Sequence, residues 1–153
     1  MKKFNTDLYY GDIEVGDEFI TATRTISEAD VMLFAGLTGD YNELHTSASF
    51  AEKNAYGERI AHGMLTLAMA NGLYMRLNHF NNSTIANLGI KDWKFTKAVK
   101  FGDTIYTRIV LMEKSLTSNP ARGIINWHVD VCNQNDEVVA TGTWVKMLTN
   151  RQV

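Results

Sequence analysis

A carboxylate and an imidazole lie close together in the first third of the chain. Asp40 and His45 fall in the run from Gly39 to His45, GDYNELH. Two such groups within reach of each other can hold a water molecule between them and take its proton, which is general acid–base chemistry. The pattern Gly-Asp-x-Asn is also ordinary turn chemistry, and a histidine in a loop is common. Taken alone, the two residues leave both interpretations open.

A second position of chemical interest is the start of an apolar segment, at His62 and Gly63 in the run IAHGM. The first backbone amides of a helix have no acceptor within the helix and carry a partial positive charge. Because Gly63 has no side chain, a ligand oxygen can approach its amide closely. Such a donor can polarise a carbonyl group and hold a developing oxyanion. A glycine that only lets the chain turn into the helix would look the same.

The elements that would position these residues begin with helices. Ser27 can cap a helix that runs to about Leu37, with Asp30 near its positive end and with Ile26 and Val31 placed as a hydrophobic staple. A second, short helix is expected near residues 47–53.

The segment from His62 to Leu77 has the length of a helix and is apolar on nearly every face. A helix of this kind must be covered on all sides. Thr66, Asn71 and Arg76 interrupt its apolar stretch, which is shorter than the ~20 residues that span a bilayer. We therefore expect a core helix and no membrane partner.

Strands are expected on both sides of these helices. One runs from Glu18 to Thr25, and after Asn82 the chain turns to β character. The later strands are predicted at Trp93–Thr96, Thr104–Leu116, Gly123–Val131 and Glu137–Leu148, with the last two joined as a hairpin. Helices followed by a run of antiparallel strands indicate an α+β fold, with one sheet packed on one long buried helix.

Length and composition narrow the class of protein. The 153 residues predict one domain over 1–153, and the 45% hydrophobic and 21% charged residues are typical of a globular chain rather than a disordered one. A net charge of −2 leaves no basic surplus for nucleic acid. The single Cys132 and four scattered histidines show no zinc spacing, so no metal is expected. The first residues lack an apolar signal core, which favours a cytoplasmic location.

The two candidate segments together resemble the MaoC-like dehydratases, which include the (R)-specific enoyl-CoA hydratases. The most specific parts of the resemblance are Asp-x-Asn-x-Leu-His, ending at His45, and Ala-His-Gly-Met-Leu, around Gly63. The resemblance covers nearly the whole chain, through runs at 13–17, 25–31, 34–45, 56–65, 101–104 and 133–139.

This resemblance implies a hot dog fold, in which an antiparallel sheet wraps around a long central helix. It also implies a homodimer, with higher oligomers left open, whose sheets join and whose active sites lie near the interface. Members of the family add water reversibly to trans-2-enoyl thioesters of CoA or acyl carrier protein. The products are (R)-3-hydroxyacyl thioesters, and neither a metal nor an organic cofactor takes part.

The resemblance also implies roles for individual residues. Asp40 and His45 match the pair that binds and activates water, and Gly63 matches the helix amide that holds the thioester carbonyl. Asn42 and His62 are expected to support the site. Which member of the pair protonates C2 is left open. Glu43 stands where the family usually has proline, so the loop lacks the φ restraint that proline would impose.

Leu67, Asn71 and Tyr74 follow Gly63 on one face of the expected helix. If that face lines an acyl pocket, Tyr74 narrows it and Asn71 adds polarity, which would suit a short or polar acyl chain. The alternative is that these side chains only pack inside the dimer.

Two other functions compete with hydration. A hot dog thioesterase would direct water to the carbonyl carbon and release a free thiol, although the motif around Asp40 and His45 speaks against it. A non-catalytic acyl-CoA-binding protein would leave the thioester unchanged, because a fold alone does not determine a function.

Overall fold

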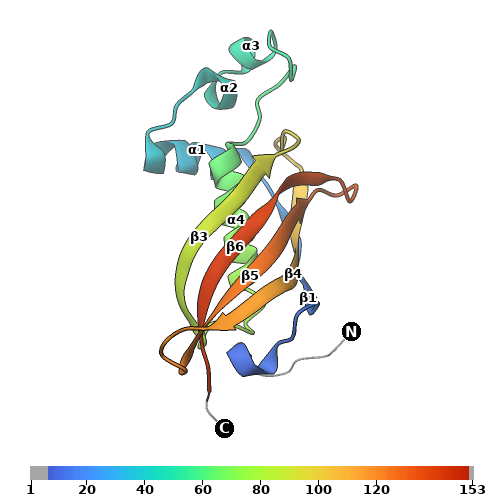
Figure 1. Cartoon of the computed structure of the whole chain (residues 1–153). Coiled ribbons are helices and arrows are strands. Elements are labelled where there is room, and N and C mark those ends of the chain that lie inside the picture. The colour runs from blue at the N-terminus through green and yellow to red at the C-terminus, as the bar shows by residue number, and fades with distance from the viewer. Residues whose placement is uncertain (1–6, 152–153) are drawn as a thin grey trace.

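The computed structural model describes residues 7–151, in which an antiparallel sheet wraps around one long helix (Figure 1). The six-stranded sheet has the order β1-β4-β5-β6-β3, and β2 pairs with β4. Its strands are β1 (Glu18–Ile20), β2 (Arg24–Thr25), β3 (Thr84–Phe95), β4 (Thr104–Leu116), β5 (Arg122–Cys132) and β6 (Val138–Thr149). The predicted α+β architecture is therefore confirmed, and so is the final hairpin, because β5 and β6 pair antiparallel.

The central helix is α4 (Gly63–Met75), and the others gather at the end of the molecule where α4 begins (Figure 1). They are α1 (Glu28–Thr38), α2 (Glu43–Thr46) and α3 (Ala48–Ala51), while a 3-10 turn, η1, spans Tyr10–Asp12. None of the helices within residues 7–151 is long and apolar enough to cross a bilayer.

The start of α1 follows its sequence closely. The Ser27 side chain accepts a hydrogen bond from the Asp30 amide, and the Asp30 carboxylate accepts one from the Ser27 amide. This reciprocal capping box satisfies two backbone donors at the helix start. Ile26 and Val31 are both fully buried, as the predicted staple requires. The start of α1 is thereby anchored to the core.

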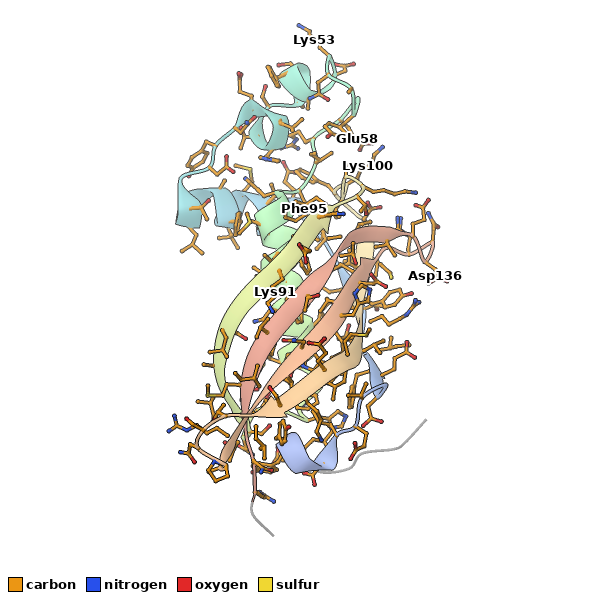
Figure 2. The ribbon with its side chains drawn as sticks, in the orientation of Figure 1. Lys53, Glu58, Lys91, Phe95, Lys100 and Asp136 are labelled. Carbon is orange, nitrogen blue, oxygen red and sulfur yellow. The ribbon has the colours of Figure 1, made fainter. Side chains whose placement is uncertain are left out.

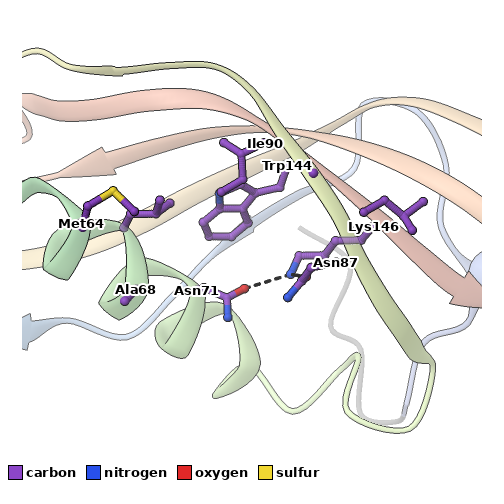
Figure 3. Close-up of a pocket in the computed structure, with 10 residues that line it drawn as sticks. Met64, Ala68, Asn71, Asn87, Ile90, Trp144 and Lys146 are labelled. Carbon is purple, nitrogen blue, oxygen red and sulfur yellow. Dashed lines mark hydrogen bonds between the residues drawn. The ribbon is translucent and has the colours of Figure 1, made fainter. Parts of the chain in front are cut away.

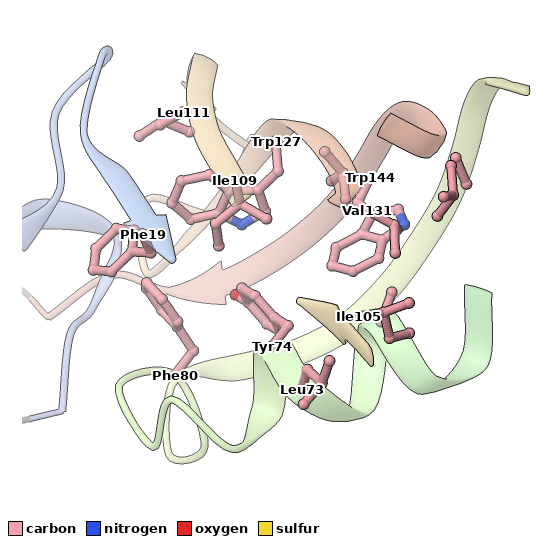
Figure 4. Packing of buried hydrophobic residues seen from close by; sticks show 14 of the residues in the cluster. Phe19, Leu73, Tyr74, Phe80, Ile105, Ile109, Leu111, Trp127, Val131 and Trp144 are labelled. Carbon is pink, nitrogen blue, oxygen red and sulfur yellow. The ribbon is translucent and has the colours of Figure 1, made fainter. Parts of the chain in front are cut away.

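The core lies between α4 and the concave face of the sheet (Figure 4). Strands β4 and β5 alternate between buried and partly exposed residues, as half-buried strands do. Trp127 of β5, Tyr74 of α4 and Phe80 are fully buried, and the Tyr74 and Phe80 rings stack with centroids 5.3 Å apart. This cluster holds α4 at a constant height above the sheet.

Two predicted strands differ from the structure. The segment from Glu18 to Thr25 is divided into β1 and β2. Strand β3 begins at Thr84, well before the predicted Trp93, and it is an edge strand that pairs with β6 alone within the described sheet. Its first half is exposed at Ile85, Leu88 and Ile90 and its register with β6 shifts three times, so no alternation marks it in the sequence.

Helix α4 is not covered on all sides by its own chain, contrary to expectation. Met64 is 59% exposed, and Ala68, Gly72 and Arg76 continue an exposed stripe at intervals of one turn. Met64 and Ala68 therefore leave an apolar part of this stripe exposed in the single chain.

Candidate active site

The loop after α1 presents Asp40. The helix ends at Gly39, whose φ of 79° lies in the left-handed region that glycine adopts without strain. The Asp40 amide then donates to the Thr38 hydroxyl (3.2 Å), and the Asp40 carboxylate accepts a hydrogen bond from the Asn42 amide (3.3 Å). The Asp40 side chain remains 53% exposed, so its carboxylate is oriented by the loop and still open to water.

His45 lies on the short helix α2, which Asn42 caps by accepting from the Leu44 amide (2.9 Å). The Nδ1 atom of His45 is 2.8 Å from the carbonyl oxygen of Ile60. A carbonyl oxygen can only accept, so Nδ1 carries the proton and Nε2 of the neutral ring keeps its lone pair. The fold therefore sets His45 in the tautomer that a general base requires. Asn42 holds the start of the helix that carries His45, and its supporting role in the site stays a prediction.

His62 connects the two catalytic candidates. It is 2% exposed, its ring lies 3.8 Å from the His45 ring between centroids, and its Nε2 donates to the Asp40 carbonyl oxygen at 2.9 Å. The ring of Phe34 packs on it from α1, with 5.0 Å between centroids. His62 thus ties the Asp40 loop to the start of α4 and supports the ring of His45.

The three side chains converge on a small volume. One carboxylate oxygen of Asp40 and one ring nitrogen of each of His45 and His62 all lie within 4.8 Å of one another. A water molecule can bridge groups at this separation. The same groups are chemically able to bind a metal ion. One nitrogen of each imidazole, however, already faces a carbonyl oxygen, which leaves a single nitrogen per ring for any ligand.

Gly63 is the first residue of α4, directly beside this cluster. A cleft of about 360 Å³ is lined by His45, Gly63 and Thr66, with the end of β3 and residues 96–99 as its opposite wall. A Cβ atom on Gly63 would lie 3.0 Å from the Phe95 ring, whose position is labelled in Figure 2. Gly63 therefore packs against the Phe95 ring without a side chain, and a larger residue at this position would have to displace that ring. His45 and Gly63 are brought together here, and Asp40 stands next to His45.

A second cavity of about 360 Å³ begins beside the first, at Met64, and continues along α4 to Asn71. Leu67 and Asn71 line it, together with β3 residues and with Trp144 and Lys146 of β6. Tyr74 is not among its lining residues. Tyr74 was predicted to narrow an acyl pocket, but it lies in the core. Its ring packs against the Trp144 ring (5.8 Å between centroids) and against the ammonium group of Lys146.

Lys146 lines this cavity and was not predicted from the sequence. Side chains at alternate positions of a strand share a face, so Lys146 lies on the same face as Trp144 and Leu148, both buried. In the sequence, the sign of this residue was a lysine on the inward face of a strand, between two apolar residues of the same face.

Comparison with known proteins identifies the family and the fold. The sequence profile of the MaoC like domain matches residues 12–131. Protein MaoC of Klebsiella aerogenes is 35% identical over 71% of the chain, which spans only about a third of that protein (32%). The 3-hydroxybutyryl-CoA dehydratase of Methylorubrum extorquens is 33% identical over 88% of the chain and 80% of its own length.

Solved structures show the same fold. A protein described as the monoamine oxidase regulatory protein of Archaeoglobus fulgius superposes with a TM-score of 0.90 at 32% identity, covering 97% of this chain and 98% of its own. R-hydratase PhaJ1 from Pseudomonas aeruginosa has a TM-score of 0.79 at 29% identity, over 96% and 89%.

A Mycobacterium tuberculosis protein with a double hotdog fold matches at a TM-score of 0.83 and 20% identity, over 95% of this chain and 45% of its own. This likeness identifies the architecture as the hot dog fold. Because the sequence profile covers most of the chain and the folds agree over its length, we conclude that the chain belongs to the family of MaoC-like dehydratase domains.

Proposed function

We propose that the chain is a hydratase/dehydratase that adds water reversibly to a trans-2-enoyl thioester, giving the (R)-3-hydroxyacyl thioester. The observation that carries the proposal is the convergence of three groups at one end of α4. A ring nitrogen of His45 and a carboxylate oxygen of Asp40 lie within 4.8 Å of each other, and Gly63 lines the same cleft as His45. The (R) stereochemistry is taken from the resemblance to the (R)-specific hydratases. We also propose a cytoplasmic location.

The geometry supports a stepwise addition. The thioester carbonyl oxygen accepts a hydrogen bond from the Gly63 amide, which draws electron density from C3. Asp40 and His45 hold a water molecule and remove one of its protons as its oxygen bonds to C3. The C2–C3 π electrons move to the carbonyl oxygen as an enolate, and C2 then takes a proton while the carbonyl re-forms. No residue in this scheme requires a bound metal or organic cofactor.

The acyl carrier is proposed to be CoA or acyl carrier protein, and the active unit a homodimer. Strand β3 leaves one edge unpaired within the described sheet, and Met64, Leu88 and Ile90 expose apolar surface beside it. An unpaired edge next to an apolar stripe favours pairing with another strand. A second copy of the chain, joined along β3, would cover the stripe on α4 that the chain itself leaves open.

The test of this proposal follows the loss of enoyl-thioester absorbance when the protein is added to crotonyl-CoA and to longer or branched enoyl-CoAs. We expect turnover, and we expect Asp40→Asn to lower kcat/KM by roughly 10²- to 10⁴-fold, the usual contribution of a positioned acid–base group. Glu52→Gln makes the same change of carboxylate to amide at an exposed residue that ends α3 and is not among the residues lining the cleft, and it is the matched control.

Other outcomes would point elsewhere. Free thiol released from a saturated acyl-CoA would identify a thioesterase, and tight binding of enoyl-CoA without any turnover would identify a binding protein. If Asp40→Asn were as active as the native protein, the assignment of the catalytic pair would be wrong.

A further inference from the structure

The second cavity contains a buried cation. Lys146 is 1% exposed, and its ammonium group donates to the side-chain oxygens of Asn71 (2.9 Å) and Asn87 (2.5 Å). Figure 3 shows the lysine reaching from β6 toward α4 and β3 at one end of the cavity. It is thus held at a defined point, with its charge directed to the helix that carries Gly63.

This charge lacks a counter-ion. Within residues 7–151, no carboxylate oxygen lies within 4.0 Å of the Lys146 ammonium group, whose other neighbours are the rings of Tyr74 (4.5 Å to the centroid) and Trp144 (5.2 Å). Burial lowers the pKa of Lys146 from 10.5 to about 8. Buried charges in proteins are normally paired, because the desolvation of an unpaired ion is unfavourable. Two amide oxygens and two ring faces compensate only in part.

The rest of the cavity is apolar. Met64, Leu67, Ala68, Leu88 and Ile90 form most of its wall, and Asn71, Asn87 and Lys146 supply its polar groups. A mainly apolar cavity with a few convergent polar groups is the usual form of a site for a small organic ligand. The charged end and the apolar wall together match an aliphatic chain that ends in an anion.

The cavity is also in the right place relative to the cleft. Gly63 and Thr66 line the cleft while Met64 and Leu67 line the cavity, so the two lie side by side at the start of α4, and only the cavity continues to Asn71. On β3 they are separated along the strand, with Phe95 at the cleft and residues 87–90 at the cavity. An acyl chain whose thioester binds at Gly63 would extend toward Lys146.

We propose that the acyl group of the substrate carries a carboxylate at the end far from the thioester, and that Lys146, aided by the Asn71 amide, binds it. This inference rests on the proposed function and names its substrate class: monothioesters of dicarboxylic acids. The carboxylate would supply the counter-ion that none of the described residues provides, and the apolar wall would contact the carbons between the two ends.

The alternative is that Lys146 only fastens α4 and β3 to β6 through the two asparagines. A purely structural lysine would affect stability and would not distinguish between ligands. The test must therefore compare ligands that differ only at the far end of the acyl chain.

Calorimetric binding of saturated thioesters makes this comparison without any turnover. Succinyl-CoA, glutaryl-CoA and adipyl-CoA are compared with butyryl-CoA. We expect the best dicarboxylic thioester to bind about 10- to 100-fold more tightly than butyryl-CoA, as one charged hydrogen-bonded contact provides. Lys146→Met should abolish this preference. Lys53→Met, at the exposed tip labelled in Figure 2, removes the same charge far from the cavity and should retain it.

Equal binding of all four thioesters by the native protein would overturn the inference, and so would a preference that survives Lys146→Met. If Lys146→Met does not fold, Asn71→Leu serves as the second variant and should weaken the preference. Hydration assays separate the two proposals. Turnover of crotonyl-CoA with no advantage for an enoyl-CoA ending in carboxylate refutes the Lys146 assignment alone. No turnover of any enoyl-CoA counts against the hydratase, while the binding data still decide the role of Lys146.

Discussion

Lys146→Met should change how the stability of the protein depends on pH, and this effect can be measured without a ligand. The pKa of Lys146 is lowered from 10.5 to about 8 because burial removes water from its ammonium group, and no charged group among its described neighbours opposes this. Its surroundings are the side chains of Asn71, Asn87, Tyr74 and Trp144. Of these only Tyr74 titrates, and burial raises its pKa far above the pH range from 7 to 10 in which the effect is measured.

The sign and size of the effect follow from linkage. Below about pH 8 both the folded and the unfolded chain hold the proton on Lys146, and the full desolvation penalty of roughly 3 kcal/mol is present. Between about pH 8 and 10.5 the folded state has lost a proton that the unfolded chain still binds. Stability therefore rises with pH in this window, by roughly 2 kcal/mol between pH 7 and 10.

Urea denaturation of the native protein and of Lys146→Met, at equal protein concentration and at pH values from 7 to 10, measures this contribution. Other groups titrate in both proteins, so their effects cancel in the difference between the two free energies of unfolding. The lost hydrogen bonds to Asn71 and Asn87 shift that difference by a constant. We expect the native protein to gain roughly 2 kcal/mol on the variant across the range. A difference that stays constant with pH would show that Lys146 is not desolvated, and the argument for a missing counter-ion would fail.

Two further predictions concern the catalytic end of α4. Gly63→Ala would place a methyl group 3.0 Å from the Phe95 ring and beside the helix amide. We expect kcat/KM to fall by at least about tenfold because the methyl group obstructs the amide, and we expect little loss of Tm because alanine is a good helix former. The Gly63→Ala/Phe95→Ala double variant should not recover activity, because the methyl group is still present. His62→Phe would keep a ring against His45 but remove the donor to the Asp40 carbonyl oxygen, so kcat should fall by about tenfold, whereas an unchanged kcat would limit His62 to packing.

Where local chemistry decides the structure, the sequence was a sufficient guide. Ser27 at the start of α1 satisfies backbone donors wherever the rest of the chain lies, and the alternation in β4 is imposed by one buried face. The motifs around His45 and Gly63 predicted two loops that the structure brings to one cleft. Their meeting depends on how α1 and α4 pack, and it was expected through a family resemblance rather than through spacing.

Where tertiary packing decides, the sequence was insufficient. Leu67, Asn71 and Tyr74 share a helical face, but β6 ends the cavity before it reaches Tyr74, because Trp144 lies between them. Helical periodicity contains no information about a side chain that arrives from another strand. Lys146 was missed for the same reason, since its contacts to α4 and β3 are long-range.

The cavity that Lys146 closes shares its wall with the surface that we assign to the dimer. Met64, Leu88 and Ile90 line the cavity and are each about half exposed in the single chain. A partner joined along β3 would bury these side chains and restrict the access of water to the cavity. The attraction between Lys146 and a carboxylate would then act in a medium of lower dielectric constant, where it is stronger.

Selection of the acyl group should therefore depend on assembly. Ile90→Lys places a charge on the unpaired edge strand and should shift the sedimentation coefficient of the protein from that of a dimer to that of a monomer. The monomer should also lose most of the preference for succinyl-CoA over butyryl-CoA, although Lys146 is unchanged. Ile20→Lys, at a similarly exposed residue of β1, is the control and should leave both properties intact. A monomeric Ile90→Lys variant that still prefers the dicarboxylic thioester would show that the cavity of one chain is sufficient, and the coupling between interface and acyl selection would be wrong.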